Sequence, residues 1–120
     1  MPASYPLALY QGDTTSIAFA FSQDGAPLDL RDAIAAAEVR ARPGGDAILL
    51  VFDCSIPAAA PHNVVELRLP ADAWAGYVAG NCEGAWDLQL TYPSDGTVWT
   101  PIAGPARITA DVTDTTGGLP

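Results

Sequence analysis

Polar and apolar residues alternate along much of this chain, with the period of two that is typical of β-strands packed on a core through one face. The alternation is strongest in four segments, with apolar positions at Ile17, Phe19, Phe21, Val65, Leu67, Leu69, Trp86, Leu88, Leu90, Tyr92, Ala106, Ile108, Ala110 and Val112. We expect each segment to be a half-buried strand. Turn-forming residues at Asp24-Gly25 and at 93–96 separate some of these strands.

Two further strands are predicted from shorter signals. Leu7 and Leu9 mark a short edge strand with Pro6 near its start. Residues 47–56 form a continuous apolar run with β-branched and aromatic members, which favours a central strand. This strand is expected to pair with the preceding one across the turn at residues 43–45.

The segment that precedes this turn is ambiguous. Residues 31–42 are rich in alanine and have high helix propensity. Ala37, Val39 and Ala41 nevertheless alternate with charged residues. We favour a turn at residues 29–32 followed by a strand, because tertiary context often overrides propensity. A helix remains the alternative.

Residues 70–80 do not follow the alternation of apolar and polar residues. Pro70 opens the segment, Asp72 is a candidate cap, and apolar residues follow at helical spacing until Gly80. The pattern predicts one or two helical turns that bridge two sheets.

Together these elements predict an all-β chain, an antiparallel β-sandwich of seven or eight short strands with one short connecting helix. A small closed barrel is the second possibility. We expect a single domain over residues 1–114 and a flexible C-terminal tail over residues 115–120.

Charge excludes several classes of partner. The chain has 14 acidic and 5 basic residues, no lysine, and a net charge of −9. Nucleic-acid binding depends on basic side chains that neutralise phosphates, so we expect no nucleic-acid partner. An anionic membrane surface is disfavoured for the same reason. The N-terminus lacks the features of a signal peptide, and no apolar run is long enough to span a membrane.

No constellation of catalytic or metal-binding residues is evident. Cys54 and Cys82 are expected to be reduced, buried thiols rather than a disulfide, and their spacing does not fit zinc. His62 is the only histidine and has loop neighbours. The aspartates at 24, 46 and 95 lie in predicted turns, where this residue type is common. We expect no catalytic residue, no metal and no cofactor.

The three tryptophans are the best candidates for binding, because an exposed tryptophan can stack on a sugar or anchor an interface. Trp86 belongs to the core face of its strand, and Trp74 is expected to plug one open end of the sandwich. Residues 97–102 place Val98 and Ile102 on one face and Trp99 on the other. Trp99 is thus either exposed at an interface or buried in a second layer. Trp99 and Trp74 are the candidate interface residues.

Several short motifs follow one another between about residues 10 and 114. They are Gly12-Asp13-Thr14, Asp24-Gly25-Ala26-Pro27, Asp29-Leu30, Val39-Arg40, Trp86-Asp87-Leu88, Gly104 and Asp111-Val112-Thr113. Each motif alone is common in turns and strands, and the specificity lies in their order. In this order the chain resembles the small β-sandwich domains of tail, baseplate-upper and fibre-attachment proteins in tailed-bacteriophage virions.

This resemblance implies an immunoglobulin-like fold used as a structural or adaptor module, often in symmetric copies, with no catalytic residues to carry over. It also favours the strand at Val39. In larger relatives such a domain precedes a fibre or receptor-binding region, whereas this chain ends at Pro120. The resemblance therefore implies a stand-alone virion component or an adaptor that needs other subunits around it.

We accordingly expect a non-enzymatic protein of the virion tail or outer surface, assembled in the host cytoplasm. Its partners would be other virion subunits of the tail, baseplate or fibre-attachment region, in a homo-oligomeric arrangement. Two alternatives remain open. One is a carbohydrate-binding module that uses an exposed tryptophan for adsorption to host glycans, and the other is a capsid decoration protein.

Overall fold

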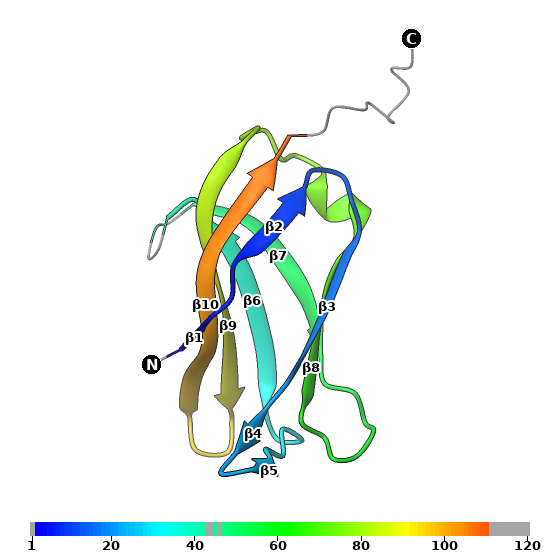
Figure 1. Cartoon of the computed structure of the whole chain (residues 1–120), viewed down its shortest axis with the longest axis vertical. Coiled ribbons are helices and arrows are strands. Elements are labelled where there is room, and N and C mark those ends of the chain that lie inside the picture. The colour runs from blue at the N-terminus through cyan, green and yellow to red at the C-terminus, as the bar shows by residue number, and fades with distance from the viewer. Residues whose placement is uncertain (1, 43–44, 46, 111–120) are drawn as a thin grey trace.

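The computed structural model describes residues 2–42, 45 and 47–110. Within these residues the chain forms ten strands and one 3-10 turn (Figure 1). The elements are β1 (Ala3–Ser4), β2 (Leu7–Tyr10), β3 (Thr15–Ala20), β4 (Ser22–Gln23), β5 (Ala26–Pro27), β6 (Ile34–Arg40), β7 (Ile48–Ser55), β8 (Val64–Leu69), η1 (Ala71–Trp74), β9 (Cys82–Tyr92) and β10 (Thr97–Thr109). Seven of the strands have four or more residues, which confirms the predicted all-β class and strand number.

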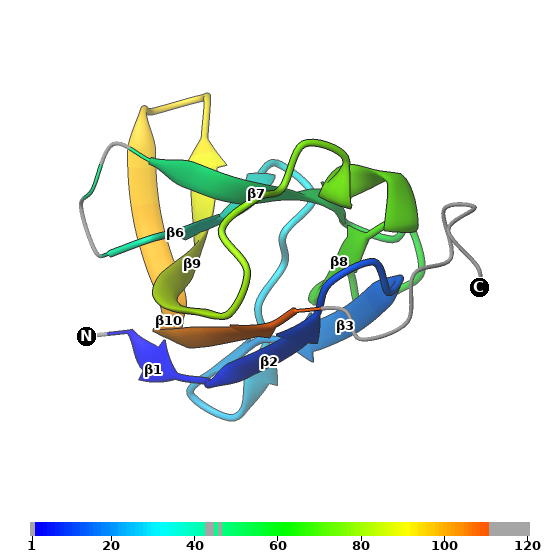
Figure 2. The ribbon, with the colours of Figure 1, turned by 90° about the horizontal axis from the view of Figure 1, so that it is seen from above.

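One curled sheet forms both layers of the sandwich. Its strand order is β1-β10-β9-β6-β7-β8-β3, with β2 also paired to β10. β7 takes part in both layers, because Val51 pairs with Glu38 on β6, whereas Cys54 pairs with Leu67 on β8. Figure 2 shows β7 crossing from the side of β6 and β9 to the side of β8. β4 and β5 form a separate small hairpin.

The pairing order is that of an immunoglobulin-like sandwich. In such a fold one layer contains the B–E pair and the other contains the order C–F–G. Here β3–β8 corresponds to the first and β6–β9–β10 to the second. β7 connects the two layers between the positions of strands C and E. The predicted fold class is therefore confirmed.

The prediction of a wholly antiparallel sheet is wrong at the N-terminus. β1 and β2 run parallel to β10, with Ala3 opposite Ile102 and Leu7 opposite Ala106. Between them, the carbonyl of Tyr5 accepts a hydrogen bond of 2.7 Å from the Trp86 indole. A Cβ atom on Gly104 would lie 2.5 Å from the same oxygen, so glycine is needed for this close approach. Alternation reports the face of a strand but not its direction, which is why the sequence did not reveal this pairing.

The predicted core positions are confirmed where the strands cover them. Val65, Leu67 and Leu69 of β8 are buried, as are Leu88 and Leu90 of β9. Every buried residue in the described ranges is apolar. No buried side-chain nitrogen or oxygen in these ranges lacks a hydrogen-bond partner. The core therefore carries no unsatisfied polar side chain that would destabilise it.

β6 confirms the strand that was favoured over a helix. Ala37 and Val39 are buried, and β6 is paired on both sides, with β7 and β9. Long-range pairing thus overrides the helix propensity of the alanines. The β6–β7 pairing is also confirmed. Pro43, Gly44, Asp46, Val112 and the tail at 115–120 lie outside the described residues.

The predicted helix at residues 70–80 is shorter than expected. The 3-10 turn ends at Trp74, and Pro70 rather than Asp72 occupies the N-cap, without a side-chain hydrogen bond. Gly76 has a φ of +84°, which is incompatible with a continuing right-handed helix. Val78, expected on the helix, is 93% exposed.

The two predicted C-terminal strands are one strand, β10, with an irregularity at its centre. Trp99 pairs with Leu90 and Ile102 pairs with Leu88. Moving from one pair to the next therefore advances three residues along β10 but only two along β9. This bulge changes the alternation. Trp99 and Ile102 consequently share the inward side, and the prediction that Trp99 lies opposite Ile102 is wrong.

Candidate functional site

Two surfaces of the molecule combine exposed apolar side chains with a recess. The first, here called the sheet face, is the outward side of β7, β6, β9 and β10. Ile34, Val51 and Val98 project from it and are 61%, 55% and 57% exposed. Strand register places Ile34, Thr91 and Val98 in one row across three strands. Val51 lies further along the same face, opposite Glu38. Isolated exposed apolar residues are common, but the row formed by Ile34 and Val98 on one sheet face is typical of an interaction surface.

Two ion pairs lie on the sheet face, together with carboxylates that are in no ion pair. Arg40 contacts Glu38 at 2.8 Å, and Arg107 contacts Glu83 at 3.0 Å. Asp87 is the direct cross-strand neighbour of Glu38. Partial burial raises the pKa of Asp87, the Glu38 carboxylate raises it further, and Arg40 opposes the shift. Because the two ion pairs cancel and Asp87 belongs to neither, the sheet face keeps a net negative charge that is smaller than that of the chain as a whole.

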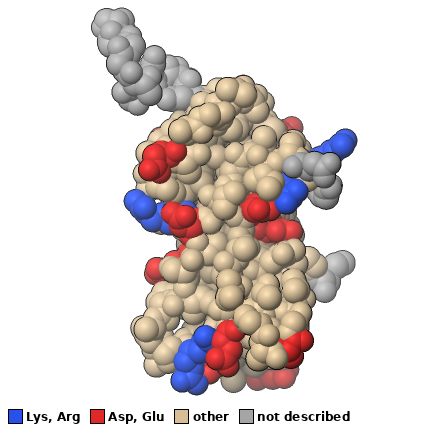
Figure 3. Space-filling view, turned by 180° about the vertical axis from the view of Figure 1, so that it is seen from behind, with Lys and Arg blue, Asp and Glu red and all other residues tan. Residues whose placement is uncertain are grey.

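A shallow recess of about 450 Å³ lies among these charges. Its lining includes Ala85, Ala103 and Pro105, which have small uncharged side chains. Figure 3 shows this side of the molecule, with charged side chains gathered across the middle and at the lower end. Between these two groups lies an area without charged side chains.

The second surface, here called the aromatic cleft, lies at the end of the sandwich where the β4–β5 and β9–β10 hairpins approach one another. It has a volume of about 330 Å³ and is lined by Ser22, Gln23, Leu28, Tyr92, Thr97 and Trp99. Trp99 is 40% exposed, and its ring centroid is 6.3 Å from that of Phe21. The Trp99 indole N–H makes no hydrogen bond to the part of the chain that the structure describes.

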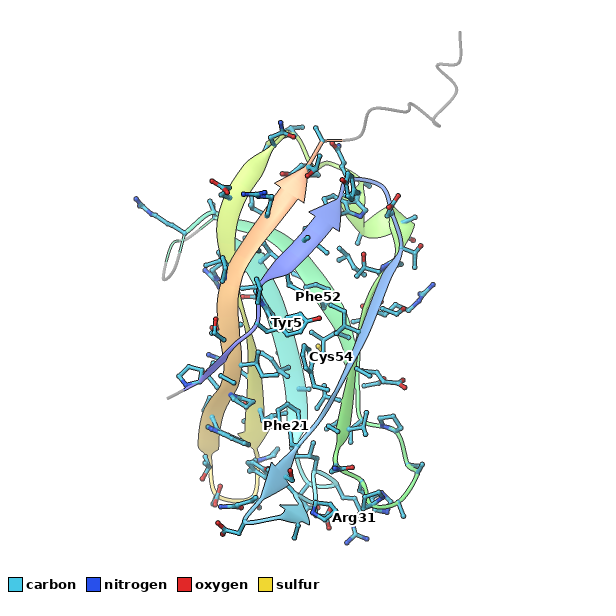
Figure 4. All side chains as sticks on the ribbon, viewed as in Figure 1. Tyr5, Phe21, Arg31, Phe52 and Cys54 are labelled. Atoms are coloured by element: carbon cyan, nitrogen blue, oxygen red, sulfur yellow. The ribbon has the colours of Figure 1, made fainter. Side chains whose placement is uncertain are left out.

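Backbone hydrogen bonds fix both walls of the aromatic cleft. The Phe21 amide donates to the Asn63 carbonyl at 2.9 Å, and the Phe21 carbonyl accepts from the Leu28 amide and the Asn63 side chain. Figure 4 shows Phe21 at the lower end of the sandwich, between β4 and the β9–β10 strands. On the other wall, the Asp95 carboxylate accepts a hydrogen bond of 2.9 Å from the Thr97 amide. Hydrogen bonds thus tie Phe21 on one wall to the sandwich and Thr97 on the other wall to its own turn.

Carboxylates surround the aromatic cleft without lining it. Burial raises the pKa of the Tyr92 hydroxyl, and nearby Asp29, Asp32 and Asp95 raise it further. Hydrogen bonds from Thr97 lower the pKa of Asp95. Hydrogen bonds from Arg31 hold the pKa of Asp29 at about 2, so it stays ionised at neutral pH. This negative surround disfavours an anionic ligand.

Of the two candidate interface residues, the structure leaves only Trp99 at the surface. Trp74 is buried, and its indole donates a hydrogen bond of 3.0 Å to the Asp13 carbonyl. Its ring packs edge-on against Tyr77. Trp86 is also buried, as predicted for the core. Sequence reasoning did not single out Ile34, Val51 or Val98. The only sequence signal for this surface was the continuous apolar run that contains Val51. Both faces of that strand carry apolar residues, although the fold covers only one face.

The remaining residues considered for chemistry lie apart from both surfaces or have structural roles. Cys54 and Cys82 are unpaired and half-buried rather than fully buried, and burial raises the pKa of the Cys54 thiol. His62 is in a loop, and Asp24 is in the β4–β5 turn, as predicted. Among the described residues, no three His, Cys, Asp or Glu side chains are grouped so as to hold a metal. The helical residues described here do not reach the length and hydropathy of a membrane-spanning helix.

Comparisons with known proteins add little to this geometry. No protein-family model matches the chain, and no curated protein matches it. Among solved structures, the ZIG-8–RIG-5 IG1–IG1 heterodimer matches with a TM-score of 0.43 and 11% identity. The match covers 89% of this chain and 83% of the other. Such a likeness is too weak to support the fold assignment, which rests on strand pairing.

Proposed function

We propose that this protein is a non-catalytic docking module that contacts neighbouring protein subunits through the sheet face. The observation that carries the proposal is the exposed set Ile34, Val51 and Val98 on the outward side of the sheet. Apolar side chains of this size are unfavourable in water, and covering them stabilises a complex.

The charge distribution supports docking at this surface rather than elsewhere. The chain has a net charge of −9, so most approaches by an acidic subunit are repulsive. On the sheet face the ion pairs Arg40–Glu38 and Arg107–Glu83 largely cancel. Interface cores are depleted in charged residues and their rims are polar, so the uncharged row of Ile34, Thr91 and Val98 suits the core of a contact and the ion pairs suit its rim.

We further propose that the assembly is the virion of a tailed phage, with this chain as a structural or adaptor subunit of the tail, baseplate or fibre-attachment region. The ordered motifs from Gly12-Asp13-Thr14 to Asp111-Val112-Thr113 support this assignment through their resemblance to phage β-sandwich domains. The acidity favours a position away from packaged DNA, because the chain would be repelled by phosphate.

Incorporation into particles tests both parts. In a phage that encodes this chain, mass spectrometry of purified virions should detect the protein. Val51→Asp and Val98→Asp should lower its copy number at least about tenfold, because each places a charge in the apolar contact. Val78→Asp is the matched control, since Val78 is 93% exposed and lies outside the sheet face. Wild-type copy number in both sheet-face variants would exclude this face as the docking surface. Absence of the protein from virions, or DNA binding at moderate salt, would exclude the phage assignment.

A further inference from the structure

We propose that the aromatic cleft binds a neutral sugar residue of a glycan, a binding activity separate from docking through the sheet face. The cleft combines an accessible indole with uncharged polar side chains at its rim. A pyranose ring has one C–H face and a rim of hydroxyl groups. It can therefore stack on an aromatic face and form hydrogen bonds around it at the same time.

The aromatic part of the site is supplied by Trp99 and supported from behind. The bulge on β10 turns Trp99 to the same side as Ile102, into the space between the two hairpins. Bulges are frequent where a strand must re-aim a side chain at a binding site. Phe21 holds the indole from one side, with an interplanar angle of 61°. The electron-rich face of an aromatic ring attracts the weakly positive C–H groups of a sugar.

The polar part of the site comes from Ser22, Gln23 and Thr97. The Ser22 and Gln23 side chains make no hydrogen bond within the described ranges, so both can bond a ligand. The Trp99 indole N–H is likewise without a hydrogen bond to these ranges. These groups offer both donors and acceptors, as the hydroxyls of a sugar require.

Charge and size select the kind of sugar. No Asp, Glu, Arg, Lys or His side chain lines the cleft, whereas Asp29, Asp32 and Asp95 lie close enough to Tyr92 to raise its pKa. Sialylated, sulfated or phosphorylated glycans would meet Asp32 and Asp95, and the nearby Arg31 is already ion-paired with Asp29 at 2.6 Å. The volume of about 330 Å³ is at the lower end of small-ligand sites and fits one or two sugar rings, not a protein surface.

Titration of the full-length protein with neutral oligosaccharides tests the proposal. Maltotriose, cellotriose and N,N′,N″-triacetylchitotriose would be added at up to about 10 mM, with tryptophan fluorescence and amide NMR shifts as readouts. We expect saturable binding of at least one of them, with shifts in residues that line the cleft. Trp99→Ala should weaken it at least about tenfold and Gln23→Ala about threefold, because each removes part of the contact.

Tyr10→Ala is the matched control, since Tyr10 is an exposed aromatic residue on β2, outside the cleft. It should leave the affinity unchanged. Trp99→Phe retains an aromatic ring against Phe21 and should show intermediate affinity, which separates loss of stacking from loss of fold. The proposal is overturned if none of the three neutral sugars binds, or if Trp99→Ala binds as well as the wild type. It is also overturned if 3′-sialyllactose or a proline-rich peptide occupies the cleft more tightly than every neutral sugar. These outcomes are independent of virion incorporation.

Discussion

Trp86 and Trp99 lie on the two strands of the same hairpin and point to the same side of the sheet, yet their surroundings differ. Trp86 is buried, its ring is stacked 6.0 Å from Phe19, and its indole donates to the Tyr5 carbonyl. Trp99 is 40% exposed, touches Phe21 and has no such hydrogen bond within the described chain.

The N-terminal segment accounts for the difference. It runs beside β10, and Figure 4 shows Tyr5 reaching from it toward the middle of the sandwich. Tyr5 packs edge-on against Phe19 at 5.1 Å and against Trp86 at 6.3 Å. At the other end of the hairpin, no described segment covers Trp99 in the same way. The same residue type thus closes the fold at one end and is left available to a ligand at the other.

The largest expected effect separates the two tryptophans by stability. Trp86→Ala should lower the free energy of unfolding by about 3–5 kcal/mol, because it leaves a cavity and frees the Tyr5 carbonyl from its partner. Trp99→Ala should cost less, about 1–2 kcal/mol, because 40% of the side chain is already exposed and only its buried part loses contacts. Urea denaturation of both variants measures the contrast. Equal losses would show that Trp99 belongs to the core.

A smaller effect tests how closely the N-terminal segment approaches β10. Gly104→Ala should destabilise the fold by about 1–3 kcal/mol, because its new methyl group collides with the Tyr5 carbonyl. Amide exchange should become faster at Tyr5, whose N–H donates to Ala103. Gly25→Ala is a contrasting variant. It meets no atom within 4 Å and is strained only through its φ of +80°. Unchanged exchange at Tyr5 in Gly104→Ala would contradict the close contact.

The smallest expected effect concerns two carboxylates on the same hairpin, whose pKa values move in opposite directions. The pKa of Asp87, beside Trp86, is raised by burial and Glu38. The pKa of Asp95, near Trp99, is lowered by hydrogen bonds from Thr97. An acid whose pKa is raised by folding destabilises the fold once ionised, above that pKa, and this cost is relieved as the pH falls. For Asp95 the sign is reversed, and its stabilisation is lost as the pH falls through its lowered pKa.

Asp87→Asn should therefore stabilise the protein at neutral pH by about 0.2–1 kcal/mol, the range for removing a like-charge cross-strand pair. The gain should vanish at about pH 3, where the aspartate is protonated in both states. Asp95→Asn should give no gain at neutral pH. Thermal melts across this pH range, with carboxyl NMR titrations of the wild type, measure both. A gain for Asp87→Asn that persists at low pH would have to come from packing rather than charge.

The fold was predictable largely because the pleat of a strand fixes the face of each side chain. Val65, Leu67 and Leu69 could be assigned to the core from their spacing alone, and β8 buries all three. The parallel position of β1 and β2 was not predictable, because alternation carries no information about strand direction. The short 3-10 turn was overestimated because Trp74 and Tyr77 have helical spacing but belong to the turn and the loop that follows.

The candidate sites were less predictable because they depend on register between distant strands. Trp99 was predicted as an interface candidate and is 40% exposed, but its face was predicted wrongly, since the bulge shifts the alternation. Pro101 was an available signal: a proline cannot donate to the ladder and within a sheet marks an edge or a bulge. Ile34 and Val98 are 64 residues apart in sequence and share a row only through Thr91. No local pattern could bring them together.

The parallel pairing of the first and last strands has a mechanical consequence. The N-terminal segment begins beside the middle of β10, with Ala3 opposite Ile102. Its pairing continues to the C-terminal end of β10, where Tyr10 lies opposite Thr109. A force that pulls the two ends apart is directed along the strands. It therefore shears the hydrogen bonds of this seam together instead of opening them one at a time. A subunit joined to its neighbours through both ends would resist such a load until the whole seam yields.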